Sequence, residues 1–218
     1  MTLDVVVLGV FVADTAYRAQ RQPRMGETIL GQSFALGPGG KGSNQSVAAG
    51  MAGASVGFIT KLGKDPFADM ALATWKKAGV TCLATQHADD YTGAAYIFVD
   101  ENTGDNAIIV CPGAAATISF SDIDTQAEAI QECKVFMTQL EQPIDAAEYA
   151  LACARKAGAT TILNPAPAVE LPTSMIALCD FVTPNEIEAE TITGITVNSP
   201  KDAVAAAEAL LAKGAGGA

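Results

Sequence analysis

The chain has 218 residues, of which 50% are hydrophobic, and carries a formal net charge of −11. This length suits one large domain or a domain with a small appendage, and the acidic balance argues against non-specific binding to nucleic acid or to an anionic membrane. The first residues contain no basic cluster before their apolar run, so we expect no signal peptide and a cytoplasmic protein.

The five cysteines are scattered without paired spacing, and the single histidine, His87, lies in a polar stretch. We expect reduced, mostly buried thiols of the kind found in cytosolic proteins. Since only one histidine is available as a base, Cys–His and Ser–His catalysis have little support.

The first third of the chain is predicted to contain two buried strands. Residues 3–9 form a β-branched run that ends in Gly9, and Asp14 follows shortly after it. A glycine-dense loop leads into a predicted helix over 43–51, and the second buried strand covers 55–62. An acidic residue just beyond a buried strand lies where open α/β sheets place ligand groups.

The next helix has clear signals at both ends. Asp65 is suited to the N-cap and Pro66 to the first helical turn, while Gly79 ends a helix predicted over 66–77. By contrast, residues 15–36 are polar and irregular, and we interpret them as short antiparallel strands.

Three strand-like runs follow one another at 80–85, 94–99 and 106–111. Consecutive strands predict antiparallel pairing, unlike the alternation of strand and helix elsewhere. Together, residues 15–36 and 80–111 are expected to form a small separate sheet over the main domain. Such a lid would exclude water from a transfer reaction.

From residue 122 onward, strands and helices alternate. The predicted strands are 135–140, 160–163 and 181–183, and the predicted helices are 144–156, 186–193 and 200–213. Alternation of this kind predicts a mostly parallel sheet with right-handed crossovers.

Polar residues follow several of these strands. Asp14, Glu141, Asn164 and Asn185 are all expected at the carboxyl edge of the sheet. Any one of them could simply cap a turn. Four together favour a ligand site.

The loop at 37–45 formally matches the dinucleotide pattern G-x-G-x-x-G, but it does not follow the first buried strand. The Walker A pattern also fails, because Gly42 rather than Ser or Thr follows Lys41. An oxygen-only Mg²⁺ site could draw on the acidic run at 186–190, although Glu186 and Glu190 share a helix face that excludes Glu188. A solvated helix start explains two of these three acids equally well.

Four segments carry a resemblance to a known family: 39–45 (GGKGSNQ), 137–141 (MTQLE), 164–168 (NPAPA) and 183–190 (TPNEIEAE). In combination they resemble the ribokinase-like (PfkB) family of sugar kinases. The resemblance implies a three-layer α/β sandwich with a mostly parallel central sheet and a small β-sheet lid that often forms a dimer interface.

The resemblance also implies a function and its residues. ATP would phosphorylate the terminal hydroxyl of a pentose, ribose or 2-deoxyribose, to the 5-phosphate. The positions that match sugar contacts are Asp14, Gly39, Gly40, Lys41, Asn44 and Glu141. Asn185 matches a nucleotide-binding position and Glu188 a Mg²⁺-organising one. The implied partners are a small sugar, ATP and a second copy of the chain bound through the lid.

Two departures from the family pattern matter. Val12 stands where the pattern has Asn, and Val cannot hydrogen-bond a sugar hydroxyl, so we expect a site that tolerates or prefers 2-deoxyribose. The D-T-x-G-A-G-D run, which supplies the catalytic base, is absent. The adenine pocket and a K⁺ site belong to the same part of the family fold. We therefore interpret 1–218 as an incomplete ribokinase-like domain that has no catalytic base of its own and is inactive alone.

Two alternatives remain open. A nucleoside kinase of the same family would need apolar and aromatic room for a base, which the Thr-Gly-Ala run at 92–94 does not indicate. A non-catalytic sugar-binding or dimerising module would bind sugar without binding ATP.

Overall fold

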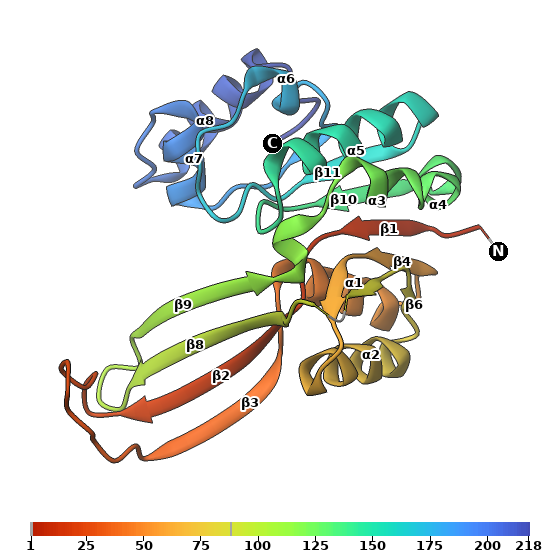
Figure 1. The fold of residues 1–218 in the computed structure, drawn as a ribbon. Helices are drawn as coiled ribbons and strands as arrows, with labels where there is room; N and C mark the ends of the chain where they lie inside the picture. Colours follow the sequence, from red (N-terminus) through yellow and green to blue (C-terminus); the bar gives the residue numbers. More distant parts are fainter. Residues whose placement is uncertain (1, 88) are drawn as a thin grey trace.

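The computed structural model describes residues 2–87 and 89–218. Figure 1 shows a main body built on a parallel sheet and a second sheet that projects from it. The order of the six strands in the central sheet is β12-β11-β10-β1-β4-β6, and every pairing is parallel. These strands are β1 Val5–Leu8, β4 Val56–Ile59, β6 Thr81–Cys82, β10 Val135–Thr138, β11 Thr160–Leu163 and β12 Phe181–Val182.

Helices cover both faces of this sheet because the strands are apolar on both sides. Val7 of β1 packs in one core with Phe58 and Trp75, beneath α1 (Lys41–Met51) and α2 (Pro66–Ala78). Val6 and Leu8 face a second core on the opposite side. That core includes residues of α3 Phe120–Asp124, α4 Ala127–Glu132, α5 Ile144–Ala157, α6 Thr173–Ile176, α7 Glu186–Thr193 and α8 Pro200–Ala212. The predicted three-layer α/β sandwich is thereby confirmed.

The second sheet has four strands in the order β3-β2-β8-β9. They are β3 Ser33–Gly39, β2 Val12–Ala19, β8 Thr92–Asp100 and β9 Asn106–Gly113. Antiparallel pairing joins β2 to β3 and β8 to β9, whereas β2 and β8 run parallel. The parallel pair was not expected. It arises because β2 and β8 are each the first strand of a hairpin that leaves the body.

The second sheet draws on different residues than the ranges 15–36 and 80–111 suggested. Residues 81–82 form β6, which lies beside β4 in the central sheet. Residues 85–87 form β7 (Thr85–His87), which pairs with β5 (Lys61–Gly63). Helix α2 carries the chain back along the central sheet, so β6 pairs in parallel with β4. The chain then enters the second sheet at β8.

Two of the five cysteines depart from the expected burial. Cys82 and Cys111 are exposed, since one lies on the edge strand β6 and the other on the projecting sheet. Cys133 and Cys179 are buried, and burial raises their thiol pKa to about 11 and about 12. Across the helices that the structure describes, none has the length and apolarity needed to cross a membrane.

Candidate active site

A pocket lies where the projecting sheet meets the body. Its volume is about 190 Å³, and it is bounded by β2, the start of α1, the end of β10 and the β8–β9 hairpin. The lining residues are Val12, Asp14, Gly40, Lys41, Asn44, Ala95, Ile97, Ile108, Val110 and Glu141. Of the six residues expected to contact sugar, the structure places five in this lining, and Gly39 lies beside Asp14.

Glu141, in the loop after β10, caps the start of α1. The N-cap residue Gly40 has no side chain to offer, so Glu141 Oε2 accepts a hydrogen bond from the Lys41 backbone N–H at 2.8 Å. Lys41 Nζ lies 3.2 Å from Glu141 Oε1. A carboxylate is favoured at a helix N-terminus by the free N–H groups and the macrodipole. This contact fixes the ammonium of Lys41 and the carboxylate of Glu141 on one wall of the pocket.

The glycines at 39 and 40 are required by close approach. Gly40 has a φ of 88°, and a Cβ there would also collide with the carbonyl oxygen of Val10. A Cβ on Gly39 would overlap with the Asp14 carboxylate. The glycine pair therefore lets Asp14 lie against the strand that leads into α1.

The surroundings of Asp14 shift its pKa. Partial burial and then the nearby charge of Glu141 raise its pKa above the ordinary value, and Lys41 opposes them. The two carboxylates and the lysine thus form one interacting group. Carboxylates accept hydrogen bonds, while an ammonium and an amide N–H₂ donate them, so this pocket can bind several hydroxyls of a small polyol.

An open groove of about 560 Å³ adjoins the pocket. It is lined by Lys41, Asn44, Gln45, Asn164, Ala166, Thr183, Pro184, Asn185 and Glu188, so Lys41 and Asn44 belong to both cavities. Of the four residues predicted to follow strands of the main sheet, Glu141, Asn164 and Asn185 do follow β10, β11 and β12, whereas Asp14 lies within β2 of the projecting sheet. Asp14 and Glu141 line the pocket, and Asn164 and Asn185 line the groove.

Asn185 and Glu188 form a reciprocal cap at the start of α7. Asn185 Oδ1 accepts from the Glu188 N–H at 2.8 Å, and Glu188 Oε2 accepts from the Asn185 N–H at 2.8 Å. Glu188 is buried, while Glu186 and Glu190 are exposed. Two of the three acids are therefore a solvated helix start, and Glu188 alone faces the groove.

A Mg²⁺ ion fits this donor set only together with a phosphate ligand. No group of three or more His, Cys, Asp or Glu side chains suited to a metal occurs among residues 2–87 and 89–218. Mg²⁺ retains several waters and commonly binds through one or two carboxylates plus substrate phosphates. One carboxylate, from Glu188, is what the groove offers.

The sequence alone indicated no role for Gln45 and Gln139. Gln139 is fully buried after β10 and donates a hydrogen bond from Nε2 to Gln45 on α1, while Asn164 donates to the Thr183 carbonyl at 3.1 Å. These amides join α1 to the ends of β10, β11 and β12. The sequence did contain a signal for Gln139, because this polar residue directly follows a buried strand and its amide must find hydrogen-bond partners.

The fold and the two adjoining cavities define an α/β domain of the sugar-kinase class. The chain belongs to the pfkB family of carbohydrate kinases, which matches it over residues 2–217. It is 36% identical to the deoxyribokinase of Salmonella typhi over 214 residues, which are 97% of this chain and 70% of that protein. It is 34% identical to the ribokinase of Haemophilus influenzae over 215 residues, 98% of this chain and 70% of that protein.

A solved structure agrees on the fold. Arabidopsis thaliana ribokinase complexed with ribose and ATP superposes with a TM-score of 0.87 at 24% identity, over 99% of this chain and 70% of that one.

Proposed function

We propose that the pocket binds a pentose and that the groove binds the phosphates of ATP. The enzyme would transfer the γ-phosphoryl group to the terminal hydroxyl, giving the 5-phosphate of ribose or 2-deoxyribose. The observation that carries this proposal is the shared wall of the two cavities, in which Lys41 and Asn44 face both.

Each polar group has a role in this proposal. Asp14 and Glu141 accept hydrogen bonds from sugar hydroxyls, and Lys41 and Asn44 donate them. Asn185 contacts the nucleotide phosphates at the start of α7, where free N–H groups favour anions. A Mg²⁺ ion held through Glu188 and the phosphates would neutralise charge. Phosphoryl transfer needs such positioning and charge neutralisation more than covalent catalysis.

Val12 supports 2-deoxyribose as the preferred sugar. Its side chain is 3% exposed and lines the pocket two residues before Asp14, at a position where the family pattern has Asn. A hydroxyl buried there without a partner costs about 1–3 kcal/mol, whereas a deoxy carbon costs nothing. Because the chain is similar both to a deoxyribokinase and to ribokinases, this choice rests on Val12.

The test compares both sugars in the parent protein and in Val12→Asn. We expect the parent to bind 2-deoxyribose more tightly, and Val12→Asn to shift the ratio towards ribose by roughly tenfold. Val12→Leu is the control, because it remains apolar and should keep the preference for the deoxy sugar. A strong ribose preference in the parent would refute the assignment.

We also infer that residues 1–218 alone bind sugar without transferring phosphate. The resemblance assigns the catalytic base to a D-T-x-G-A-G-D run that these residues do not contain. A coupled kinase assay on purified protein of 22.3 kDa is expected to show no turnover above background. Turnover that copurifies with this mass would contradict the inference.

A second copy of the chain is the proposed partner of the projecting sheet. Cross-strand pairs place Tyr17, Phe34, Leu36, Tyr96, Phe98 and Ile109 on the face opposite Asp14. Tyr17 lies 5.1 Å from Phe34 and 5.5 Å from Tyr96, measured between ring centroids. An exposed aromatic surface of this kind favours a protein interface.

A further inference from the structure

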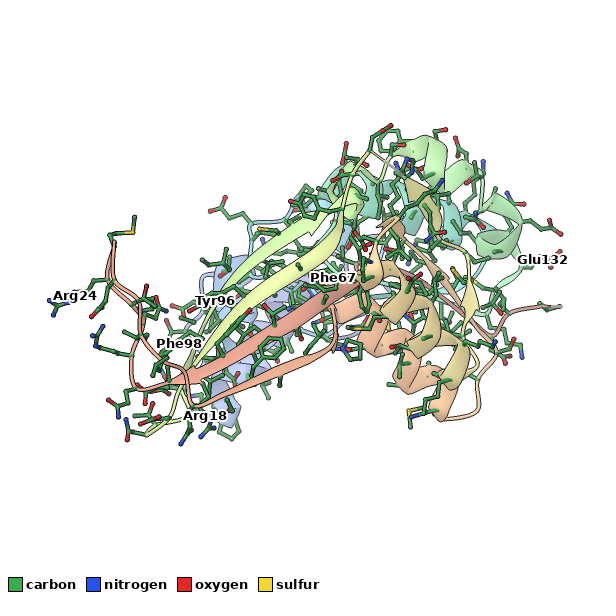
Figure 2. All side chains as sticks on the ribbon, turned by 60° about the horizontal axis from the view of Figure 1, so that its bottom comes forward. Arg18, Arg24, Phe67, Tyr96, Phe98 and Glu132 are labelled. Carbon is green, nitrogen blue, oxygen red and sulfur yellow. The ribbon has the colours of Figure 1, made fainter. Side chains whose placement is uncertain are left out.

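A short segment holds the projecting sheet where it meets the body. Residues 61–65, which we call the collar, comprise β5 and the N-cap of α2. Helix α2 contacts β2, β3 and β8 as they leave the body. Figure 2 shows Phe67, in the first turn of α2, at this junction, whereas Arg18 and Arg24 lie at the far end of the sheet.

Asp65 uses its two carboxylate oxygens for different purposes. Oδ1 accepts a hydrogen bond from the Ala68 N–H at 2.8 Å and so caps α2. Oδ2 accepts from the Thr92 N–H at 2.7 Å, at the first residue of β8. Thr92 is fully buried, and its Oγ1 accepts in turn from the Gly63 N–H at 2.9 Å. The start of β8 is therefore hydrogen-bonded to the collar through both the backbone N–H and the side-chain hydroxyl of Thr92.

The collar also holds the end of the β8–β9 hairpin. Lys61, on β5, is buried and donates from Nζ to the Thr117 carbonyl at 2.8 Å. Thr117 ends the 3₁₀ turn η1 (Ala114–Thr117), which directly follows β9. Lys61 also forms an ion pair with Asp122 at 2.8 Å. Both points at which the hairpin joins the body are thus fixed by residues 61–65.

This hairpin carries the apolar wall of the pocket. Ala95 and Ile97 lie on β8, only a few residues beyond Thr92, and Ile108 and Val110 lie opposite them on β9. Because the hairpin projects from its two fixed ends and β8 pairs with β2, a change of angle at Thr92 displaces the apolar wall, together with Asp14, relative to Lys41 and Glu141.

We propose that Asp65 is a positioning residue for the sugar site, which sets the angle of the β8–β9 hairpin through Thr92 while capping α2. This proposal depends on the proposed function for one point only, namely that the ligand of the pocket is a pentose. It predicts that the two functions of the carboxylate are separable. The cap stabilises α2, and the Thr92 contact determines how well the apolar wall covers the pocket.

Asp65→Asn separates them, because Asn is as good an N-cap as Asp but has one oxygen acceptor in place of two. Asp69→Asn is the matched control, since Asp69 is an exposed acid in the first turn of the same helix. Amide hydrogen exchange and calorimetric titration with 2-deoxyribose would be measured on both variants and on the parent. The exchange measurement needs no sugar.

In Asp65→Asn we expect exchange across residues 92–113 to accelerate by about tenfold, exchange in α2 to stay unchanged, and sugar affinity to fall by about tenfold. Asp69→Asn should match the parent in all three. Unchanged exchange across 92–113 would overturn the proposal. Loosening of the hairpin with unchanged sugar affinity would overturn it equally.

A second pair of variants covers the case in which Asp65→Asn does not fold. Thr92→Ser retains the hydroxyl that accepts from Gly63, and Thr92→Val removes it at nearly constant volume. The proposal expects faster exchange and weaker binding in Thr92→Val, and rescue of both in Thr92→Ser. Because both variants keep the bond from the Thr92 N–H to Asp65, Asp65→Ser completes the test: it keeps an N-cap oxygen but offers one acceptor in place of two. Unchanged exchange across 92–113 in Asp65→Ser contradicts the proposal. If the parent binds no pentose, the proposed function fails, and the exchange data still decide whether Asp65 holds the hairpin.

Discussion

At the scale of single residues, the site depends on where side chains are absent as much as on where they are present. The Asp14 carboxylate occupies the space that a side chain at Gly39 would fill. Gly37 lies two residues earlier on β3, and a Cβ added there would meet no atom within 4 Å, so this position tolerates a methyl group. The two glycines of one strand thus differ in function.

Gly39→Ala is expected to displace the Asp14 carboxylate and to weaken pentose binding by at least roughly tenfold. Gly37→Ala, the matched control, should leave the affinity within about twofold of the parent. Calorimetric titration measures both. Equal affinities for the two variants would show that Asp14 does not bind the sugar.

Sugar affinity should also depend on pH through Asp14. Folding raises the pKa of this carboxyl above 3.8, so the folded protein becomes protonated at a higher pH than an ordinary aspartate does. A protonated Asp14 loses acceptor strength, and affinity should decline as the pH falls through the raised pKa. The stability of the fold depends on pH in the opposite direction. It falls as the pH rises through the raised pKa, because ionised Asp14 disfavours the folded state.

The variant Asp14→Asn tests both signs. It should lose most of the pH dependence of sugar binding, and it should be at least as stable as the parent at neutral pH. Titrations from pH 7 down to pH 4 and thermal unfolding at pH 7 are the measurements. An unchanged pH profile would place the titrating group elsewhere.

Much of the site was predictable at this scale, because Glu141, Asn164 and Asn185 each follow a strand that the pattern identifies. Asp14 was also identified as a site residue, although it lies within β2 of the projecting sheet and not at the end of a strand. The buried amide of Gln139 was not, because its partner Gln45 is 94 residues away and only the folded sheet brings them together. The apolar wall was missed for a similar reason. Its residues resemble ordinary strand residues until the hairpin is placed over α1.

At the scale of elements, helix ends were predicted best. Helix α2 begins after the Asp65 cap and ends at Gly79, and α7 runs from 186 to 193 before Gly194, as the sequence indicates. Local capping chemistry determines such ends. The sheet that a strand joins depends on contacts between residues far apart in the sequence. Residues 81–87 were for this reason wrongly assigned to the projecting sheet.

The contact between α1 and α2 gives a stability prediction. The buried Trp75 indole donates from Nε1 to Ser43 Oγ at 2.9 Å, and Ser43 lies between the sugar-site residues Lys41 and Asn44. Ser43→Ala would leave this N–H unpaired, at a cost of about 1–3 kcal/mol in the free energy of unfolding.

Ser46→Ala is its control within the same helix. Ser46 is equally buried, but its hydroxyl donates to the Gly42 carbonyl inside α1. Loss of that bond should cost less than about 1 kcal/mol, since Ala favours the helix. Urea unfolding of both variants makes the comparison, and a larger loss in Ser46→Ala would contradict it.

At the scale of the whole molecule, two sheets with different tasks meet at one pocket. The central sheet delivers Glu141 and supports α1, while the projecting sheet supplies Asp14, the apolar wall and, through β3, the glycines that lead into α1 (Figure 1). The aromatic side chains on the far face of the projecting sheet, including Tyr96 and Phe98 in Figure 2, are available for a partner.

If a second copy binds that face, light scattering after size-exclusion chromatography should give about twice 22.3 kDa. Tyr17→Glu should shift the protein to the monomer, because it places a charge among the aromatic rings. Arg18→Glu, on the next residue and the opposite face of β2, should not. A parent protein that is monomeric at high concentration would refute the dimer.

The pocket's proposed ligand is a pentose, with the 2-deoxy sugar favoured over ribose. Calorimetric titration of the 218-residue protein with 2-deoxyribose and with ribose tests this most directly. We predict saturable binding of one sugar per chain, tighter for 2-deoxyribose and weakened by Asp14→Asn. Absence of binding by either sugar, or clearly tighter binding of ribose, would contradict it.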